Sequence, residues 1–152
     1  MADLKMKKIL FVCHGNICRS PMAEFLMKDM AKREGLDVYI ESAATSTEEI
    51  GNGVHYGTRR KLAEYGISCD GKRARQMTKR DYDEFDYIIG MDSWNIRNIN
   101  RIIGTDTHHK VYKLLEFAGE NGDIADPWYT HNFDETYDDI IRGLNGLKEE
   151  LR

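Results

Sequence analysis

The sequence predicts a single α/β domain of residues 1–152 in three layers, with helices flanking a four-stranded parallel sheet. Three observations support this fold class. Short apolar runs alternate with segments of helical periodicity, a pattern typical of parallel sheets covered on both faces. The chain is 41% hydrophobic and 32% charged, as expected for one domain with its own core. No internal repeat or linker-like stretch divides it.

The expected elements follow from periodicity and from capping residues. Residues 8–12 form an apolar, partly β-branched run typical of a buried strand. Pro21 suits the first turn of the helix that follows, and Gly35 suits its end. The expected strands are 8–12, 38–40, 87–91 and 111–115. The expected helices are 21–33, 58–65, one beginning at Thr78, 93–102 and 133–151, with loops at 42–46 and 116–132.

Composition limits the classes of function. A net charge of -4 argues against bulk attraction to nucleic acid. The apolar runs are too short for a membrane span, and the first residues lack the pattern of a secretory signal. Three cysteines make an odd number, which is unlike a disulfide framework and indicates a reducing, cytoplasmic setting. No metal site is expected, and a monomer is the default expectation.

The segment from Cys13 to Pro21 carries the chemistry. It places a thiol where the first strand ends, then a short loop containing Gly15, then a helix N-terminus. Backbone N–H groups converge on such a turn, and the helix dipole favours negative charge there. The sequence therefore predicts a phosphate-binding loop between the first strand and the first helix, with a nucleophile inside it.

Each residue type in this loop suits attack on a phosphate ester. The thiolate is the reactive form of Cys13, and helix N-termini and adjacent cations favour that form. The planar fork of Arg19 can hold two phosphate oxygens into the transition state. Ser20 can donate to the Cys13 sulfur when it leaves the phosphocysteine. Gly15 allows close backbone approach, and Asn16 tolerates a left-handed conformation.

A proton donor for the leaving group is expected in the loop after the fourth strand. Asp126 is the leading candidate, because that loop lies at the same sheet edge as Cys13 and Pro127 restricts its backbone. The same residue can later accept a proton from the attacking water. Trp128 and Tyr129 can form an aromatic wall for a phenyl ring.

The motif Val12-Cys13-His14-Gly15-Asn16-Ile17-Cys18-Arg19-Ser20-Pro21, followed by Met22-Ala23-Glu24, resembles that of the low-molecular-weight protein tyrosine phosphatases. Segments 42–46, 85–88 with 91–92, and 126–127 match the family in order and spacing. The resemblance implies a four-stranded parallel sheet, no cofactor, Cys13 as nucleophile, Arg19 as phosphate clamp and Asp126 as acid and base. The residues implied to bind phosphate or shape the loop are His14, Gly15, Asn16, Ile17, Cys18 and Ser20, supported by Ser42 and Asp92. At Cys18 it implies a redox-sensitive disulfide with Cys13, although plain packing is an equal alternative for Cys18.

Two positions depart from the family pattern. Glu48 stands where members often carry an aromatic wall residue, so acidic phosphopeptides are expected to be disfavoured. Lys72 and Arg73 precede the Ala-Arg-Gln segment where many members have a histidine, which leaves the outer support of the loop open.

The expected function is hydrolysis of phosphotyrosine proteins and small aryl phosphates through a phosphocysteine, inhibited by inorganic phosphate or vanadate. Three alternatives share the loop. A phosphoarginine phosphatase tends to have threonine at the position of Ile17, and an arsenate reductase needs two further cysteines where the chain offers only Cys69. A phosphocarrier module must protect its phosphocysteine from water, whereas Arg19 and Asp126 would speed its hydrolysis.

Overall fold

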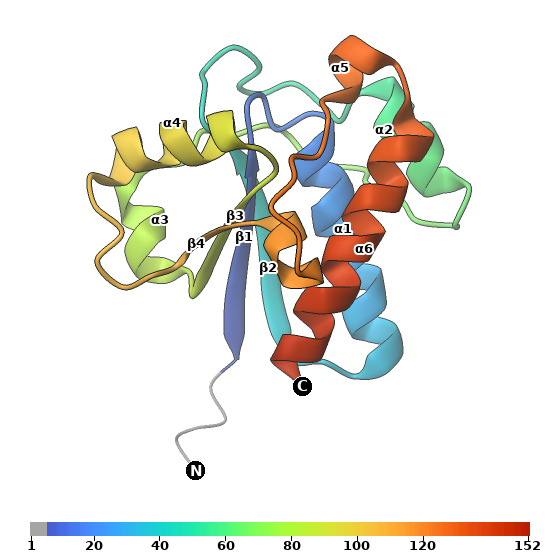
Figure 1. Ribbon diagram of the computed structural model, residues 1–152. Coiled ribbons are helices and arrows are strands. Elements are labelled where there is room, and N and C mark those ends of the chain that lie inside the picture. Colours follow the sequence, from blue (N-terminus) through green and yellow to red (C-terminus); the bar gives the residue numbers. More distant parts are fainter. Residues whose placement is uncertain (1–5) are drawn as a thin grey trace.

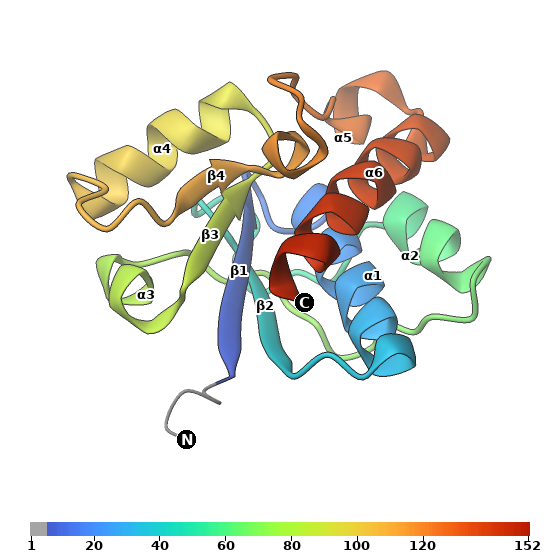
Figure 2. The same cartoon turned by 60° about the horizontal axis from the view of Figure 1, so that its bottom comes forward.

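Four parallel strands form the centre of the structure, a computed structural model that describes residues 6–152 (Figure 1). The strands are β1 (Lys7–Cys13), β2 (Val38–Ala44), β3 (Tyr87–Gly90) and β4 (Val111–Lys113). They lie in the order β2-β1-β3-β4 (Figure 2), and each neighbouring pair is parallel. The predicted fold class is therefore confirmed.

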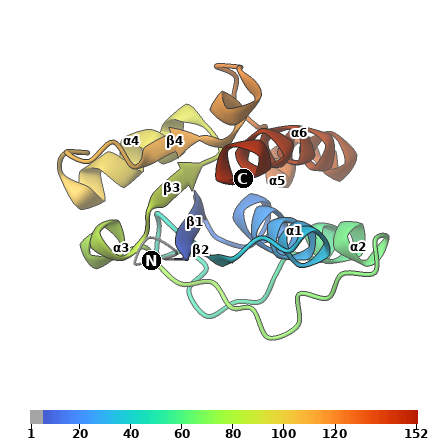
Figure 3. The ribbon, with the colours of Figure 1, turned by 90° about the horizontal axis from the view of Figure 1, so that it is seen from below.

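Helices cover both faces of this sheet. They are α1 (Arg19–Glu34), α2 (Tyr56–Ala63), α3 (Lys79–Glu84), α4 (Ser93–Ile103), the 3-10 helix η2 (Leu114–Ala118), α5 (Pro127–Thr130) and α6 (Phe133–Leu151). Seen from below, α1, α2 and α6 lie on one side of the strands and α3 and α4 on the other (Figure 3). None of the helices in residues 6–152 has the length and apolar character needed to cross a bilayer.

Strand β1 is buried on both faces because it lies between two apolar cores. Ile9 and Phe11 pack in the core shared with α1 and α6, whereas Leu10 and Val12 pack in the core shared with α3 and α4. All four side chains are fully buried. This explains why the strand reads as a continuous apolar run rather than an alternating one.

Three local predictions were wrong. Ser42, Ala43 and Ala44 belong to β2 rather than to a loop, because they pair with Phe11, Val12 and Cys13 of β1. Strand β4 ends at Lys113, and the two leucines after it turn into η2, where both are buried. The loop expected over 116–132 contains the short helix α5, which begins at Pro127 and is capped by Asp126.

Helix α6 lies against η2 at two glycines. A Cβ atom on Gly146 would lie 1.9 Å from the carbonyl oxygen of Phe117, and one on Gly143 would lie 2.5 Å from Cγ of Leu114. Neither position has room for a side chain. The close packing of α6 on η2 therefore depends on glycine at both positions.

Candidate active site

The loop of residues 13–18 leaves the carboxyl end of β1, between strands β2 and β3. After β1 the chain places β2 on one side of it and then β3 on the other side. The carboxyl end of β1 is therefore the point where strand order reverses. Ligands of open α/β sheets collect at such a point. The loop turns at Asn16, whose φ of 59° is left-handed, as its residue type allows.

The carbonyl oxygens of the loop are turned toward the segment that follows β2. Thr45 N donates to Cys13 O at 2.9 Å, Ser46 N to His14 O at 3.0 Å, and His55 N to Ile17 O at 2.8 Å. Thr58 Oγ1 donates to Cys18 O at 3.0 Å. Within residues 6–152, the backbone N–H groups of 14–18 donate to no protein acceptor. The loop thus has its donors free for an anion, at the N-terminus of α1.

The Cys13 sulfur lies in this ring and contacts Ser20 twice. The sulfur is 3.0 Å from Ser20 Oγ, and Ser20 N donates to it at 3.4 Å. The second contact comes from the first turn of α1, where unpaired N–H groups favour a negative charge. Both donors are placed to stabilise a thiolate.

Arg19 is buried and is held from three directions. Its Nη1 donates to Asp92 Oδ2 at 2.6 Å and to Ile124 O at 2.8 Å, and its Nη2 lies 3.4 Å from Asp126 Oδ2. Burial lowers the pKa of Arg19, but the negative charges of Cys13, Asp92 and Asp126 outweigh burial and raise it above its ordinary value. The guanidinium is therefore a fixed cation, oriented before any ligand arrives.

Asp126 comes from the far end of the chain and faces the same pocket. Its Oδ1 accepts from Trp128 N at 3.0 Å, which fixes the carboxyl group at the start of α5. Together with Cys13 and Arg19 it lines a pocket of about 370 Å³. The three residues expected to carry the reaction are thus brought together, although 107 positions separate Arg19 from Asp126.

A chain of hydrogen bonds runs beneath the loop from the sulfur to a buried ion pair. Asn16 Nδ2 donates to Ser20 Oγ at 2.8 Å and to Ser42 Oγ at 2.9 Å. Ser42 Oγ donates in turn to Glu24 Oε1 at 2.5 Å. Lys72 Nζ lies 3.1 Å from the same carboxylate oxygen and donates to Ser42 O at 2.8 Å. A lysine therefore fills the support position that the sequence left open.

The pocket wall includes both aromatic and acidic side chains. Trp128 and Tyr129 line it and are both exposed. Glu48 also lines it and is hydrogen-bonded to His14 Nε2 at 3.1 Å, so the His14 side chain belongs to the wall. Glu49 also lines the pocket, and its Cγ lies 3.2 Å from where a Cβ on Gly15 would be. The close approach at Gly15 is thus to Glu49.

The cysteines differ in their surroundings. Cys18 lines the pocket, and burial followed by the charge of Cys13 raises its pKa to about 12. It is therefore a neutral thiol at physiological pH. Cys69 is buried beside α2 and does not line the pocket.

Sequence reasoning missed three residues of this site: Glu24, Glu49 and Lys72. Glu24 appeared in the sequence analysis only as the last residue of a motif. Nothing in the sequence predicted that this carboxylate would be buried on α1. Lys72 was noted only as a departure from the family's histidine, with no role assigned to it. Nothing in the sequence showed that its side chain would reach Glu24.

Comparisons with known proteins agree with this geometry. The model of the family described as low molecular weight phosphotyrosine protein phosphatase matches residues 8–152. The low molecular weight protein-tyrosine-phosphatase YfkJ of Bacillus subtilis is 42% identical over 151 residues, covering 97% of both chains. Its crystal structure superposes with a TM-score of 0.92 at 41% identity, over 96% of this chain and 94% of that one.

Two further solved structures bear on function. A low molecular weight protein tyrosine phosphatase from Streptococcus pyogenes matches with a TM-score of 0.86 at 43% identity, over 97% of this chain and 94% of the other. A Drosophila arginine phosphatase matches with a TM-score of 0.87 at 27% identity, over 94% and 96%. The chain belongs to the low molecular weight phosphotyrosine protein phosphatase family and is a hydrolase of that family.

Proposed function

We propose that this enzyme hydrolyses phosphotyrosine and small aryl phosphate monoesters through a phosphocysteine intermediate. In the first step the Cys13 sulfur attacks phosphorus and forms an S–P bond while the ester P–O bond breaks. Asp126 gives its proton to the departing phenolate oxygen. Arg19 and the loop N–H groups hold the three equatorial oxygens as their charge grows.

The second step reverses the proton movement. The Asp126 carboxylate takes a proton from a water molecule, whose oxygen bonds to phosphorus as the S–P bond breaks. Cys13 leaves as a thiolate that accepts hydrogen bonds from Ser20 Oγ and Ser20 N, the two contacts already present in the structure. Inorganic phosphate is released, and phosphate or vanadate should compete for the same loop.

The observation that carries this proposal is the placement of Arg19 between two carboxylates in the pocket that holds Cys13. Asp92 fixes one side of the guanidinium at 2.6 Å, and Asp126 lies against the other side at 3.4 Å. A bound phosphate would therefore meet the clamp, the nucleophile and the acid at once. Preorganised charge of this kind supplies most of the catalysis of phosphoryl transfer.

The alternatives are weaker on the same geometry. An arsenate reductase needs a cysteine relay, but Cys69 lies outside the pocket and is itself buried. In a phosphocarrier, a carboxyl group beside the loop would promote hydrolysis of the phosphocysteine that the protein must preserve. A phosphoarginine phosphatase remains the closest rival, since a structural relative carries that activity in its name. Ile17, which lines the pocket, favours the aryl ester.

The test is a comparison of matched phosphotyrosine and phosphoarginine peptides, with vanadate as inhibitor. We expect faster hydrolysis of phosphotyrosine, and faster hydrolysis of phosphoarginine would overturn the proposal. The variant Cys13→Ser should lose turnover while it still binds phosphate. Turnover retained by this variant would discard the covalent step.

A further inference from the structure

A second cleft opens beside the catalytic pocket, toward α4. It has a volume of about 350 Å³ and shares His14, Arg19, Asp126 and Tyr129 with the catalytic pocket. Its outer wall is formed by residues of α4, including Trp94 and Asn98. Because the two cavities share four residues, the second cleft is a direct neighbour of the loop on which the phosphate of a peptide would sit.

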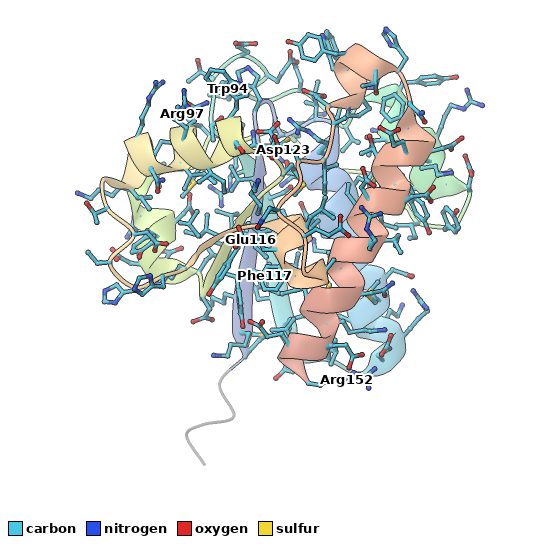
Figure 4. The ribbon with its side chains drawn as sticks, in the orientation of Figure 1. Trp94, Arg97, Glu116, Phe117, Asp123 and Arg152 are labelled. Atoms are coloured by element: carbon cyan, nitrogen blue, oxygen red, sulfur yellow. The ribbon has the colours of Figure 1, made fainter. Side chains whose placement is uncertain are left out.

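Trp94 lines this cleft but contributes to neither of the apolar cores that hold the fold together. The indole is 65% exposed at the first turn of α4 and belongs to neither apolar core. The Arg97 guanidinium lies over the ring, 4.8 Å from its centroid. Figure 4 shows both side chains on the upper side of α4, the end of the molecule at which the strands reach their carboxyl ends. The indole therefore supplies exposed aromatic surface on the α4 side of the cleft.

The charges at the inner end of this cleft are already matched. Asp92 and Asp126 both face the Arg19 guanidinium there. Arg97 does not line the cleft, and its guanidinium lies over the Trp94 ring. A charged side chain that reaches the inner end of the cleft would therefore find no unmatched partner there, whereas an apolar one would cover the exposed faces of Trp94 and Tyr129.

We infer that this cleft is a substrate subsite that takes an apolar side chain next to the phosphotyrosine, with Trp94 as its specificity-determining residue. The inference rests on the proposed phosphotyrosine hydrolysis. Partial burial of one leucine-sized side chain between the two aromatic rings should raise kcat/KM by about 5- to 10-fold, mainly through KM. A small aryl ester does not reach the cleft and should gain nothing from it.

The test uses phosphotyrosine peptides that differ at one flanking position, carrying leucine, alanine or glutamate on either side of the phosphotyrosine. The small ester 4-nitrophenyl phosphate is assayed alongside. The variant Trp94→Ala removes the wall and should fold normally, because the position is exposed and alanine favours helix. Tyr56→Ala is the matched control, since Tyr56 is also 65% exposed with an arginine over its ring, on α2.

The wild-type enzyme should prefer leucine at one flanking position by about 5- to 10-fold over glutamate. Trp94→Ala should reduce that preference to less than about 2-fold and leave hydrolysis of 4-nitrophenyl phosphate unchanged, whereas Tyr56→Ala should change neither. Three results would overturn the subsite: no preference in the wild type, a preference that survives in Trp94→Ala, or an equal loss on the small ester. If phosphotyrosine itself is not hydrolysed, the proposed function fails instead.

Discussion

The buried ion pair between Lys72 and Glu24 allows a quantitative prediction about the support of the phosphate loop. The Lys72 side chain is 13% exposed and that of Glu24 is 4% exposed, and the two charged atoms lie 3.1 Å apart. Glu24 also pairs with Lys28 at 2.6 Å, but the Lys28 side chain is 44% exposed. The variant Lys72→Met removes the buried partner, and Lys28→Met removes the exposed one.

The expected magnitudes differ because the surroundings differ. Burial lowers the pKa of Lys72, and Glu24 only partly offsets it, so the pair as a whole is not expected to be a large source of stability. The cost comes from leaving the Glu24 carboxylate without its buried partner, about 3–5 kcal/mol in such cases. Since Ser42 and Lys28 still contact Glu24, we expect about 3 kcal/mol for Lys72→Met. Lys28→Met should cost less than about 1 kcal/mol.

Thermal and urea unfolding measure this difference. For a domain of this size each kcal/mol shifts Tm by about 2–4 °C, so Lys72→Met should lower Tm by about 6–12 °C. The double variant Lys72→Met with Glu24→Gln removes both charges of this pair and keeps an acceptor for Ser42, so it should recover most of that loss. The reasoning is refuted if Lys72→Met costs no more than Lys28→Met, or if the double variant is no more stable than Lys72→Met alone.

Three other predictions concern the pocket. Asp126→Asn should slow esters with poor leaving groups by about 10²–10⁴-fold and those with good leaving groups far less, because only the former need a proton; an equal loss across a leaving-group series would reassign the acid. Glu48→Gln should raise kcat/KM for acidic phosphopeptides by about 2- to 5-fold at low salt and by less at high salt, and an effect independent of salt would point to shape instead of charge. The Cys18 thiol has its pKa raised from an ordinary 9.0 to about 12, so the unfolded chain ionises first. The free energy of unfolding should therefore fall as pH rises from 9 to 12, and urea unfolding of Cys18→Ala should show a shallower fall than the wild type; identical slopes would contradict this.

The sequence predicted the elements whose cause is local. The long helix α6 begins and ends where expected, because its apolar residues keep one period over nineteen residues. Thr78 caps α3 as predicted from its residue type. The loop of residues 13–18 lies between β1 and α1 as predicted, because a strand, a glycine-containing turn and a helix start follow one another directly. These features depend on residues close together in the chain.

The features that were missed depend on distant contacts or on competing propensities. Ser42 to Ala44 look like a loop by composition, but pairing with β1 extends them into a strand. Helix α5 could have been predicted, because an aspartate N-cap followed by proline is a common start of a helix. It was missed because the helix is only four residues long. Lys72 was noted only as a departure from the family pattern, and Trp94 carried no sequence pattern at all. Only the folded chain shows that the first pairs with Glu24 and that the second lies beside the pocket.

The two glycines of α6 have an effect that reaches beyond the packing of a helix. Any side chain at Gly146 would collide with the backbone of η2, and the loop that follows η2 carries Ile124 and Asp126. Ile124 holds Arg19 through its carbonyl oxygen. The absence of side chains at these two glycines therefore helps to set the positions of Asp126 and Arg19. Mutational tolerance in this enzyme should follow that mechanical connection rather than distance from the substrate.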